Sequence, residues 1–239
     1  MKTDEVLYVN GCSYAYGQGV HEHEYICMEQ RFSRTLSDHF GLIEVNKALP
    51  GSCNQRIARR TLVDLIKYKP KIAVIIWSDP SRREFKYGDA PWRNNEKYPF
   101  ELTQVRLKSR KYTREVEMYY KSLSSVEQDL LDTLYHMLSI KILSDSMNIP
   151  CIQLQFREGF AMDLKHSLEY NYIHYKSTLL EYINILESDH LIYGVRPGEL
   201  SSFEMIGGGY IDHTGHPNKQ SNDNVTKWAI QLIESKELL

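Results

Sequence analysis

Lys71-Ile72-Ala73-Val74-Ile75-Ile76-Trp77 is the stretch that decides the fold of this chain. After the lysine come six consecutive apolar residues, most of them β-branched, and such a run is typical of a strand whose two faces are both buried. A strand of this kind lies inside a parallel sheet that helices cover on each side. The stretch therefore predicts a parallel sheet with 71–77 as a central strand.

Four other apolar runs are candidates for the remaining strands: 6–10, 42–45, 149–156 and 191–193. Helical periodicity lies between and after these runs, over 24–40, 54–68, 124–147, 164–186 and 223–235. Strands that alternate with helices predict an α/β fold, with a doubly wound parallel sheet of about five strands.

Length and composition fit one domain. A chain of 239 residues that is 42% hydrophobic can bury one substantial core, so we expect a single domain over 1–239. The regular pattern weakens from about 79 to 122, where aromatic and charged residues mix, and we interpret this stretch as an insertion. The pattern indicates no oligomeric state.

Charge and hydropathy exclude several classes of partner. The net charge is -2 and the charged residues are interspersed, so we expect neither nucleic acid nor a membrane as partner. The chain shows neither a secretory signal nor an apolar run long enough to span a bilayer, and its four cysteines lack metal-type spacing. These features predict a cytoplasmic protein with reduced thiols.

A serine and a histidine near opposite ends of the chain are the main candidates for chemistry. Ser13 follows the first predicted strand in the sequence NGCSYAYG (10–17), and His216 lies in DHTGHPN (212–218). Serine becomes a good nucleophile when a histidine removes its proton, and a carboxylate such as Asp212 orients that histidine. Only the fold can bring such distant residues together.

Three segments that follow predicted strands supply candidate donors for an oxyanion. In open α/β sheets the active crevice lies beyond the carboxyl ends of the strands, where Ser13, Gly51 and Ser78 would meet. Gly51 could bring its backbone N–H close to a substrate, and Asn54 is a further donor candidate. With the Ser13 N–H, these groups could stabilise a tetrahedral intermediate.

These motifs resemble those of the SGNH hydrolase family, the GDSL esterases and lipases. The resemblance covers most of the chain and implies a flavodoxin-like, three-layer α/β/α fold. It also implies that Ser13 is the nucleophile, Gly51 an oxyanion donor, His216 the base and Asp212 its carboxylate partner. The chain departs from the family pattern in two places. Ser78 stands where the family has an oxyanion asparagine, and His213 stands where it has the aspartate, so that Asp212 lies one position further back.

A small charged group follows Ser78. Arg82, Arg83 and Glu84 could anchor a substrate carboxylate or phosphate, because guanidinium groups bind such anions bidentately, or they could form structural ion pairs. The sequence around them is similar to that of divergent, often phage-encoded SGNH relatives, in which W-S is followed by R-x-E. Association with a virion is accordingly an alternative location.

Competing interpretations of the same residues are weaker. His21 and His23, or His213 with His216, could bind a metal, but no convincing set of ligands accompanies them, so we predict neither a metal nor a cofactor. Cys12 is expected to be a small core residue rather than a nucleophile. The α/β-hydrolase elbow G-x-S-x-G is also disfavoured, because Ala15 occupies its second glycine position.

We therefore expect a serine esterase or acyl hydrolase that acts on a small or carbohydrate-linked ester through Ser13, His216 and Asp212. Two alternatives stay open. The first is an SGNH-like protein without catalytic activity that binds a ligand or serves in an assembly, which the missing asparagine at Ser78 would suit. The second is an acyltransferase that passes the acyl group to an acceptor other than water.

Overall fold

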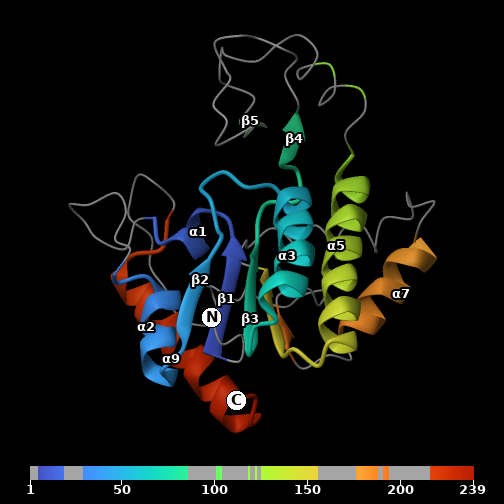
Figure 1. The fold of residues 1–239 in the computed structure, drawn as a ribbon. Helices are drawn as coiled ribbons and strands as arrows, with labels where there is room; N and C mark the ends of the chain where they lie inside the picture. The colour runs from blue at the N-terminus through green and yellow to red at the C-terminus, as the bar shows by residue number, and fades with distance from the viewer. Residues whose placement is uncertain are drawn as a thin grey trace.

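The fold is built on one parallel sheet. The computed structural model describes residues 5–18, 29–85, 101–103, 118, 122, 125–155, 176–187, 191–193 and 216–239. Five strands form the sheet in the order β2-β1-β3-β6-β7 (Figure 1). Their bounds are β1 Val6–Gly11, β2 Ile43–Asn46, β3 Ile72–Trp77, β6 Cys151–Gln155 and β7 Ile192–Tyr193. All four pairs of neighbouring strands are parallel, and the order is flavodoxin-like, which confirms the predicted fold class.

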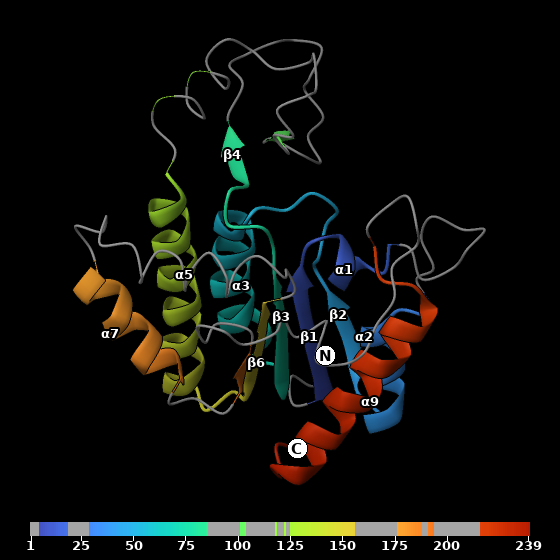
Figure 2. The ribbon, with the colours of Figure 1, turned by 180° about the vertical axis from the view of Figure 1, so that it is seen from behind.

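Helices cover both faces of the sheet and complete three layers (Figures 1 and 2). One face carries α3 (Asn54–Tyr68), α5 (Val126–Ser146) and α7 (Lys176–Glu187). The other face carries α2 (Phe32–Phe40) and α9 (Lys219–Ser235). Among the described residues, none of the helices has the length and apolar character that a membrane crossing requires.

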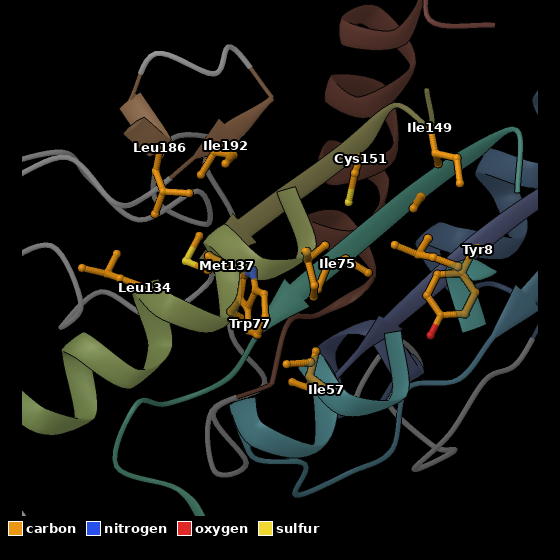
Figure 3. Packing of buried hydrophobic residues seen from close by; sticks show 14 of the residues in the cluster. Tyr8, Ile57, Ile75, Trp77, Leu134, Met137, Ile149, Cys151, Leu186 and Ile192 are labelled. Carbon is orange, nitrogen blue, oxygen red and sulfur yellow. The ribbon is translucent and has the colours of Figure 1, made fainter. Parts of the chain in front are cut away.

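The central strand β3 contributes to two separate hydrophobic cores. Its side chains alternate between the faces of the sheet, and every residue of the strand is buried. Ala73, Ile75 and Trp77 pack with residues of α3 and α5, while Ile72, Val74 and Ile76 pack with residues of α2 and α9. Figure 3 shows the first of these cores, in which Trp77 lies beside Met137 of α5. Burial on both faces is why this strand reads as a continuous apolar run.

Element boundaries differ from the sequence prediction in several places. The first helical stretch, predicted over 24–40, contains α2 from Phe32 onward, and 19–28 lie outside the described residues. The last helix begins four residues earlier than predicted, at Lys219, because the side chain of Asn218 accepts a hydrogen bond of 2.9 Å from the Ser221 N–H. The short helix α1 (Ser13–Tyr16) was not predicted at all.

Two short strands lie within the stretch interpreted as an insertion. They are β4 (Arg83–Phe85) and β5 (Glu101–Thr103), and they pair antiparallel, apart from the main sheet. In Figure 1, β4 lies above the carboxyl ends of the central strands, beyond the end of α3. The chain therefore leaves β3, passes through Ser78, and enters a separate hairpin near the edge at which active sites form in this architecture.

Candidate active site

Ser13 and His216 form a hydrogen-bonded pair. The Nε2 atom of His216 lies 3.0 Å from the Oγ atom of Ser13. Ser13 is the first residue of α1, two positions beyond the end of β1, and its side chain is buried. His216 is half-buried and lies just before Asn218, the residue that caps α9. The end of β1 thus positions Ser13, and the start of α9, near the other end of the chain, positions His216.

The turn that carries Ser13 depends on a glycine and an asparagine at the end of β1. A Cβ atom on Gly11 would lie 2.5 Å from the Ile76 carbonyl oxygen, so no larger residue fits between β1 and β3 there. The buried side chain of Asn10 accepts a hydrogen bond of 2.8 Å from the Gly11 N–H. Its amide nitrogen donates to the Ile57 carbonyl at 3.1 Å and to Thr61 Oγ1 at 2.9 Å, which ties the turn to α3.

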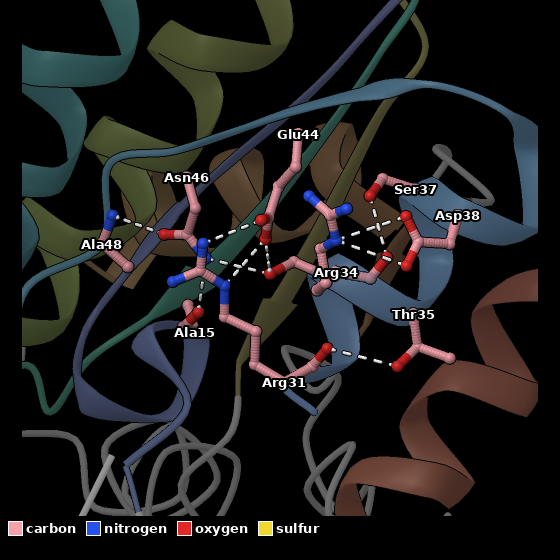
Figure 4. A network of polar contacts seen from close by, with 10 residues as sticks. Ala15, Arg31, Arg34, Thr35, Ser37, Asp38, Glu44, Asn46 and Ala48 are labelled. Carbon is pink, nitrogen blue, oxygen red and sulfur yellow. Dashed lines mark hydrogen bonds and ion pairs between the residues drawn. The ribbon is translucent and has the colours of Figure 1, made fainter. Parts of the chain in front are cut away.

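Helix α1 is also held from the side of β2. It ends at Gly17, whose φ of 94° lies in the left-handed region that favours glycine. Asn46 of β2 donates from its amide nitrogen to the Ala15 carbonyl at 2.8 Å and to Ser33 Oγ at 3.0 Å (Figure 4). A side chain of the neighbouring strand therefore fixes the helix that presents Ser13.

The buried carboxylate of Glu44 is linked to Asn46 through Ser33. Arg31 makes a bidentate pair with Glu44, with Nε–Oε1 and Nη2–Oε2 distances that are both 2.8 Å. Ser33 donates to Glu44 through its hydroxyl at 2.5 Å and accepts from Asn46, so it joins the ion pair to the asparagine (Figure 4). Bidentate charge-assisted contacts of this kind are among the stronger polar interactions in proteins. Sequence reasoning missed this network, because a glutamate on an edge strand looks like a solvent-facing residue.

The imidazole of His216 packs against Tyr14, the residue that follows Ser13. The Tyr14 ring meets it edge-on, with 5.6 Å between the ring centroids and 81° between the planes. The Nδ1 atom of His216 is buried. Asp212, predicted to orient this nitrogen, lies outside the described residues, as does His213.

The three segments predicted to supply oxyanion donors leave the sheet at one edge. Gly11 pairs with Ile76 across β1 and β3, so Ser13 and Ser78 each lie two positions beyond a paired residue. The Leu49 N–H donates to the Gly11 carbonyl at 3.2 Å, which brings the loop with Gly51 to the end of β1. Gly51 has a φ of 76°, a left-handed conformation that glycine adopts without strain.

Asn54 has its amide group committed to other residues. Its Oδ1 accepts from the Ser78 N–H at 2.7 Å, and its Nδ2 donates to the Ser78 carbonyl at 3.1 Å and to Thr133 Oγ1 at 3.0 Å. Both amide hydrogens are therefore in use, and Asn54 is 3% exposed. The geometry favours a positioning role for Asn54 at the Ser78 backbone over the direct donor role that the sequence suggested.

Arg82 and Arg83 point to different partners within the protein. Arg82 donates from Nη1 to the Ser78 hydroxyl oxygen at 2.8 Å. Arg83 is buried and forms ion pairs with two residues of α5, Asp129 and Asp132, the second at 2.9 Å. Of the two functions considered for Arg83, structural ion pairing is thus the one that its contacts favour. Glu84 lies between Arg83 and Phe85 in β4.

No cluster of three or more His, Cys, Asp or Glu side chains with metal-binding geometry occurs in the part of the chain that the structure describes. His21 and His23 lie outside that part. Cys12 is buried, with 3% of its surface exposed, as expected for a small core residue.

No protein-family model matches this chain, and no curated protein matches it. Solved structures do match. TesA superposes with a TM-score of 0.54 at 13% identity, over 98% of this chain and 99% of that chain.

Two carbohydrate esterases are also similar. Est2A, an acetyl xylan esterase from the rumen bacterium Butyrivibrio proteoclasticus, has a TM-score of 0.52 at 10% identity, over 97% of this chain and 64% of that chain. A family two carbohydrate esterase from Clostridium thermocellum, solved in complex with cellohexaose, has a TM-score of 0.50 at 13% identity, over 98% of this chain and 65% of that chain. The predicted three-layer α/β fold is therefore shared with TesA and with these two carbohydrate esterases.

Proposed function

We propose that this protein is a serine ester hydrolase in which Ser13 is the nucleophile and His216 is the general base. The observation that carries the proposal is the 3.0 Å contact between Ser13 Oγ and His216 Nε2. That distance lies within the range of about 2.6–3.2 Å over which a base takes a proton from a nucleophile. The similarity of the fold to esterases supports the same reaction class.

The reaction proceeds in two halves. The Ser13 oxygen attacks the ester carbonyl carbon while neutral His216 takes the hydroxyl proton, which gives a tetrahedral intermediate with a negative oxygen. The C–O bond to the alcohol then breaks, and His216 returns the proton to the leaving alkoxide. Water attacks the acyl-Ser13 ester with the same base, and release of the carboxylic acid restores the serine. We assign Asp212 to orient His216 through Nδ1.

The oxyanion is stabilised by donors at the edge of the sheet. The Ser13 N–H lies at the start of a helix, where backbone donors have no acceptor within the helix. The Gly51 N–H is the second donor. Its loop precedes α3, and the cap residue of that helix, Cys53, makes no side-chain cap hydrogen bond. The positive end of the α3 dipole also favours a negative charge there. We add the Ser78 hydroxyl as a third donor and exclude the Asn54 amide, which is already used.

The acyl group proposed is short, and the alcohol is a small molecule or a carbohydrate. An acetyl xylan esterase and a cellohexaose-bound carbohydrate esterase share the fold, and this supports ester-linked carbohydrate as a substrate class. This chain spans about two thirds of the length of each of those two proteins. Whatever the alcohol, the acyl-enzyme formed on Ser13 is the common intermediate.

The test is hydrolysis of p-nitrophenyl acetate together with labelling by a fluorophosphonate probe. Wild type is expected to do both, and Ser13→Ala to do neither. The matched control is Ser146→Ala, at the exposed end of α5, where the hydroxyl donates only locally to the Leu143 carbonyl at 2.7 Å. Folded wild type that is inactive in both assays would instead indicate a binding or assembly protein. Faster turnover with an added alcohol than with water alone would indicate an acyltransferase.

A further inference from the structure

Arg82 and Ser78 form a contact that the reaction just proposed does not require. We propose that Arg82 is a positioning residue that aims and polarises the Ser78 hydroxyl as an oxyanion donor. The inference rests on the proposed function and deepens it. Its starting point is the hydrogen bond of 2.8 Å from Arg82 Nη1 to Ser78 Oγ.

The direction of that hydrogen bond determines where the serine proton can go. A guanidinium group has donors and no acceptor, so Ser78 Oγ can only accept from Arg82. The hydroxyl hydrogen must therefore point away from Arg82 toward another acceptor. An ester oxygen that gains negative charge during attack by Ser13 is such an acceptor.

The rest of Ser78 is held in place. Its N–H donates to Asn54 Oδ1 at 2.7 Å, and its carbonyl accepts from Asn54 Nδ2 at 3.1 Å and from Gln155 Nε2 at 3.4 Å. Both backbone groups of Ser78 are thus used by buried amide side chains, and Ser78 itself is 3% exposed. Of its polar groups, the hydroxyl proton is the one that these contacts leave for a bound molecule.

The positive charge of Arg82 also makes the Ser78 hydroxyl a stronger hydrogen-bond donor. Hydrogen bonds in which one partner is charged are roughly twice as strong as neutral ones. In a chain of hydrogen bonds each member polarises the next, so a guanidinium on the oxygen strengthens the donation from the hydroxyl. A serine supported in this way compensates for the absent amide of an asparagine at this position.

The segment that carries Arg82 is held on both sides. Before it, the Arg82 N–H donates to the Asp79 carbonyl at 3.1 Å, and Asp79 Oδ1 accepts from the Ser81 N–H at 2.9 Å. After it, Arg83 is tied to α5 by its ion pairs with Asp129 and Asp132. The arginine is therefore presented to Ser78 by a fixed turn, and preorganised donors of this kind are the ones that stabilise a transition state.

The experiment is a double-mutant cycle on Ser78→Ala and Arg82→Met, read with p-nitrophenyl acetate and with a phenylboronic acid that forms a tetrahedral adduct on serine. Removing one oxyanion donor typically lowers kcat by a factor of about 10²–10³, so the kcat of Ser78→Ala should be lower than that of wild type by about that factor. The kcat of Arg82→Met should be lower than that of wild type by about tenfold or more, with little change in KM. In the Ser78→Ala background, Arg82→Met should have no further effect on kcat. Boronic acid affinity should fall in parallel with kcat.

Further variants separate positioning from folding and from loss of charge. Arg34→Met removes an exposed arginine of α2 and should leave kcat unchanged. Arg82→Gln keeps a neutral donor and should retain part of the kcat that Arg82→Met loses, and Arg82→Lys should retain more. Thermal unfolding of each variant tests the fold directly. If Arg82→Met does not fold, the same cycle is carried out with Arg82→Gln.

Additive losses in the double variant, or an Arg82 effect confined to KM, would overturn the inference and make Arg82 a substrate anchor. Failure of the proposed function looks different, because wild type would then be inactive or Ser13→Ala would keep its activity. Active wild type, inactive Ser13→Ala and fully active Ser78→Ala would remove the Ser78–Arg82 assignment alone.

Discussion

The Nε2 atom of His216 lies 3.0 Å from the Oγ atom of Ser13, although 203 positions separate the two residues in the chain. The parallel sheet brings the pair together, because β1 ends at the edge where α9 begins. This geometry is the one that the proposed function requires of a serine nucleophile and its histidine base.

The first prediction concerns pH. Only neutral His216 can take the Ser13 proton, so hydrolysis should fall as the solution is acidified from about pH 8 to about pH 5, in proportion to the neutral fraction of that imidazole. The rate of fluorophosphonate labelling should fall with the same midpoint, because labelling uses the same attack by Ser13. A labelling rate that does not change over this range would count against His216 as the base.

Gly11→Ala is expected to destabilise the fold. The added Cβ would meet the Ile76 carbonyl oxygen at 2.5 Å and the Ala15 Cβ at 2.8 Å, so β1, β3 or α1 must shift. Overpacking of this kind costs about 1–3 kcal/mol in the free energy of unfolding, measured by urea denaturation. Gly41→Asn is the control, since a Cβ at Gly41 meets no atom within 4 Å and asparagine tolerates the left-handed conformation found there. Equal losses for the two variants would contradict the steric explanation.

Asn46→Ala should affect both stability and catalysis. It removes the hydrogen bonds to the Ala15 carbonyl and to Ser33, and it leaves a carbonyl of α1 without this donor. A lost buried partner costs about 1–3 kcal/mol, and loosening of α1 should lower kcat more than it raises KM. Asn224→Ala, in α9, is the matched control. Unchanged kcat in a destabilised Asn46→Ala variant would show that α1 keeps Ser13 in place without Asn46.

His136 should make stability depend on pH. Burial lowers the pKa of His136 below its ordinary value of 6.5; the Asp132 carboxylate opposes this shift and the Arg83 guanidinium adds to it. The unfolded chain therefore binds a proton at this residue more readily than the folded protein does. The stability that follows is fully present above about pH 6.5 and is lost as pH falls below that value.

Urea unfolding at about pH 8 and about pH 5.5 measures this contribution. Wild type should lose more free energy of unfolding over that interval than His136→Gln does. If wild type and His136→Gln respond identically, His136 is not a source of the pH dependence.

The fold could be predicted from the sequence because its signals are local. The run 72–77 is apolar at every position because β3 is buried on both faces, and the alternation of strands and helices then limits the architecture to a doubly wound sheet. Helix α1 escaped prediction because four residues are too few to show a helical period. Helix α9 began earlier than predicted because an asparagine cap, and not apolar periodicity, determines its start.

Some residues of the candidate site could be predicted from the sequence, and others could not. Ser13 and His216 could be singled out because few residue types perform nucleophilic and base chemistry, and Ser78 could be placed after a strand. The roles of Asn10 and Asn46 could not be assigned from the sequence, because an asparagine near a strand end usually occurs in a turn. Asn54 was expected to be a direct oxyanion donor, because nothing local shows that its amide contacts Ser78 and Thr133.

By itself, the sequence determined which segments become buried strands and which residue types could act as nucleophile and base, since burial and side-chain chemistry leave their mark on neighbouring positions. The tertiary structure alone decided that His216 reaches Ser13, that Asn54 holds the backbone of Ser78, and that Arg82 donates to its hydroxyl. The physical reason is that a hydrogen bond depends on distances of a few tenths of an ångström between atoms far apart in the chain. Packing of the two cores around the sheet determines those distances.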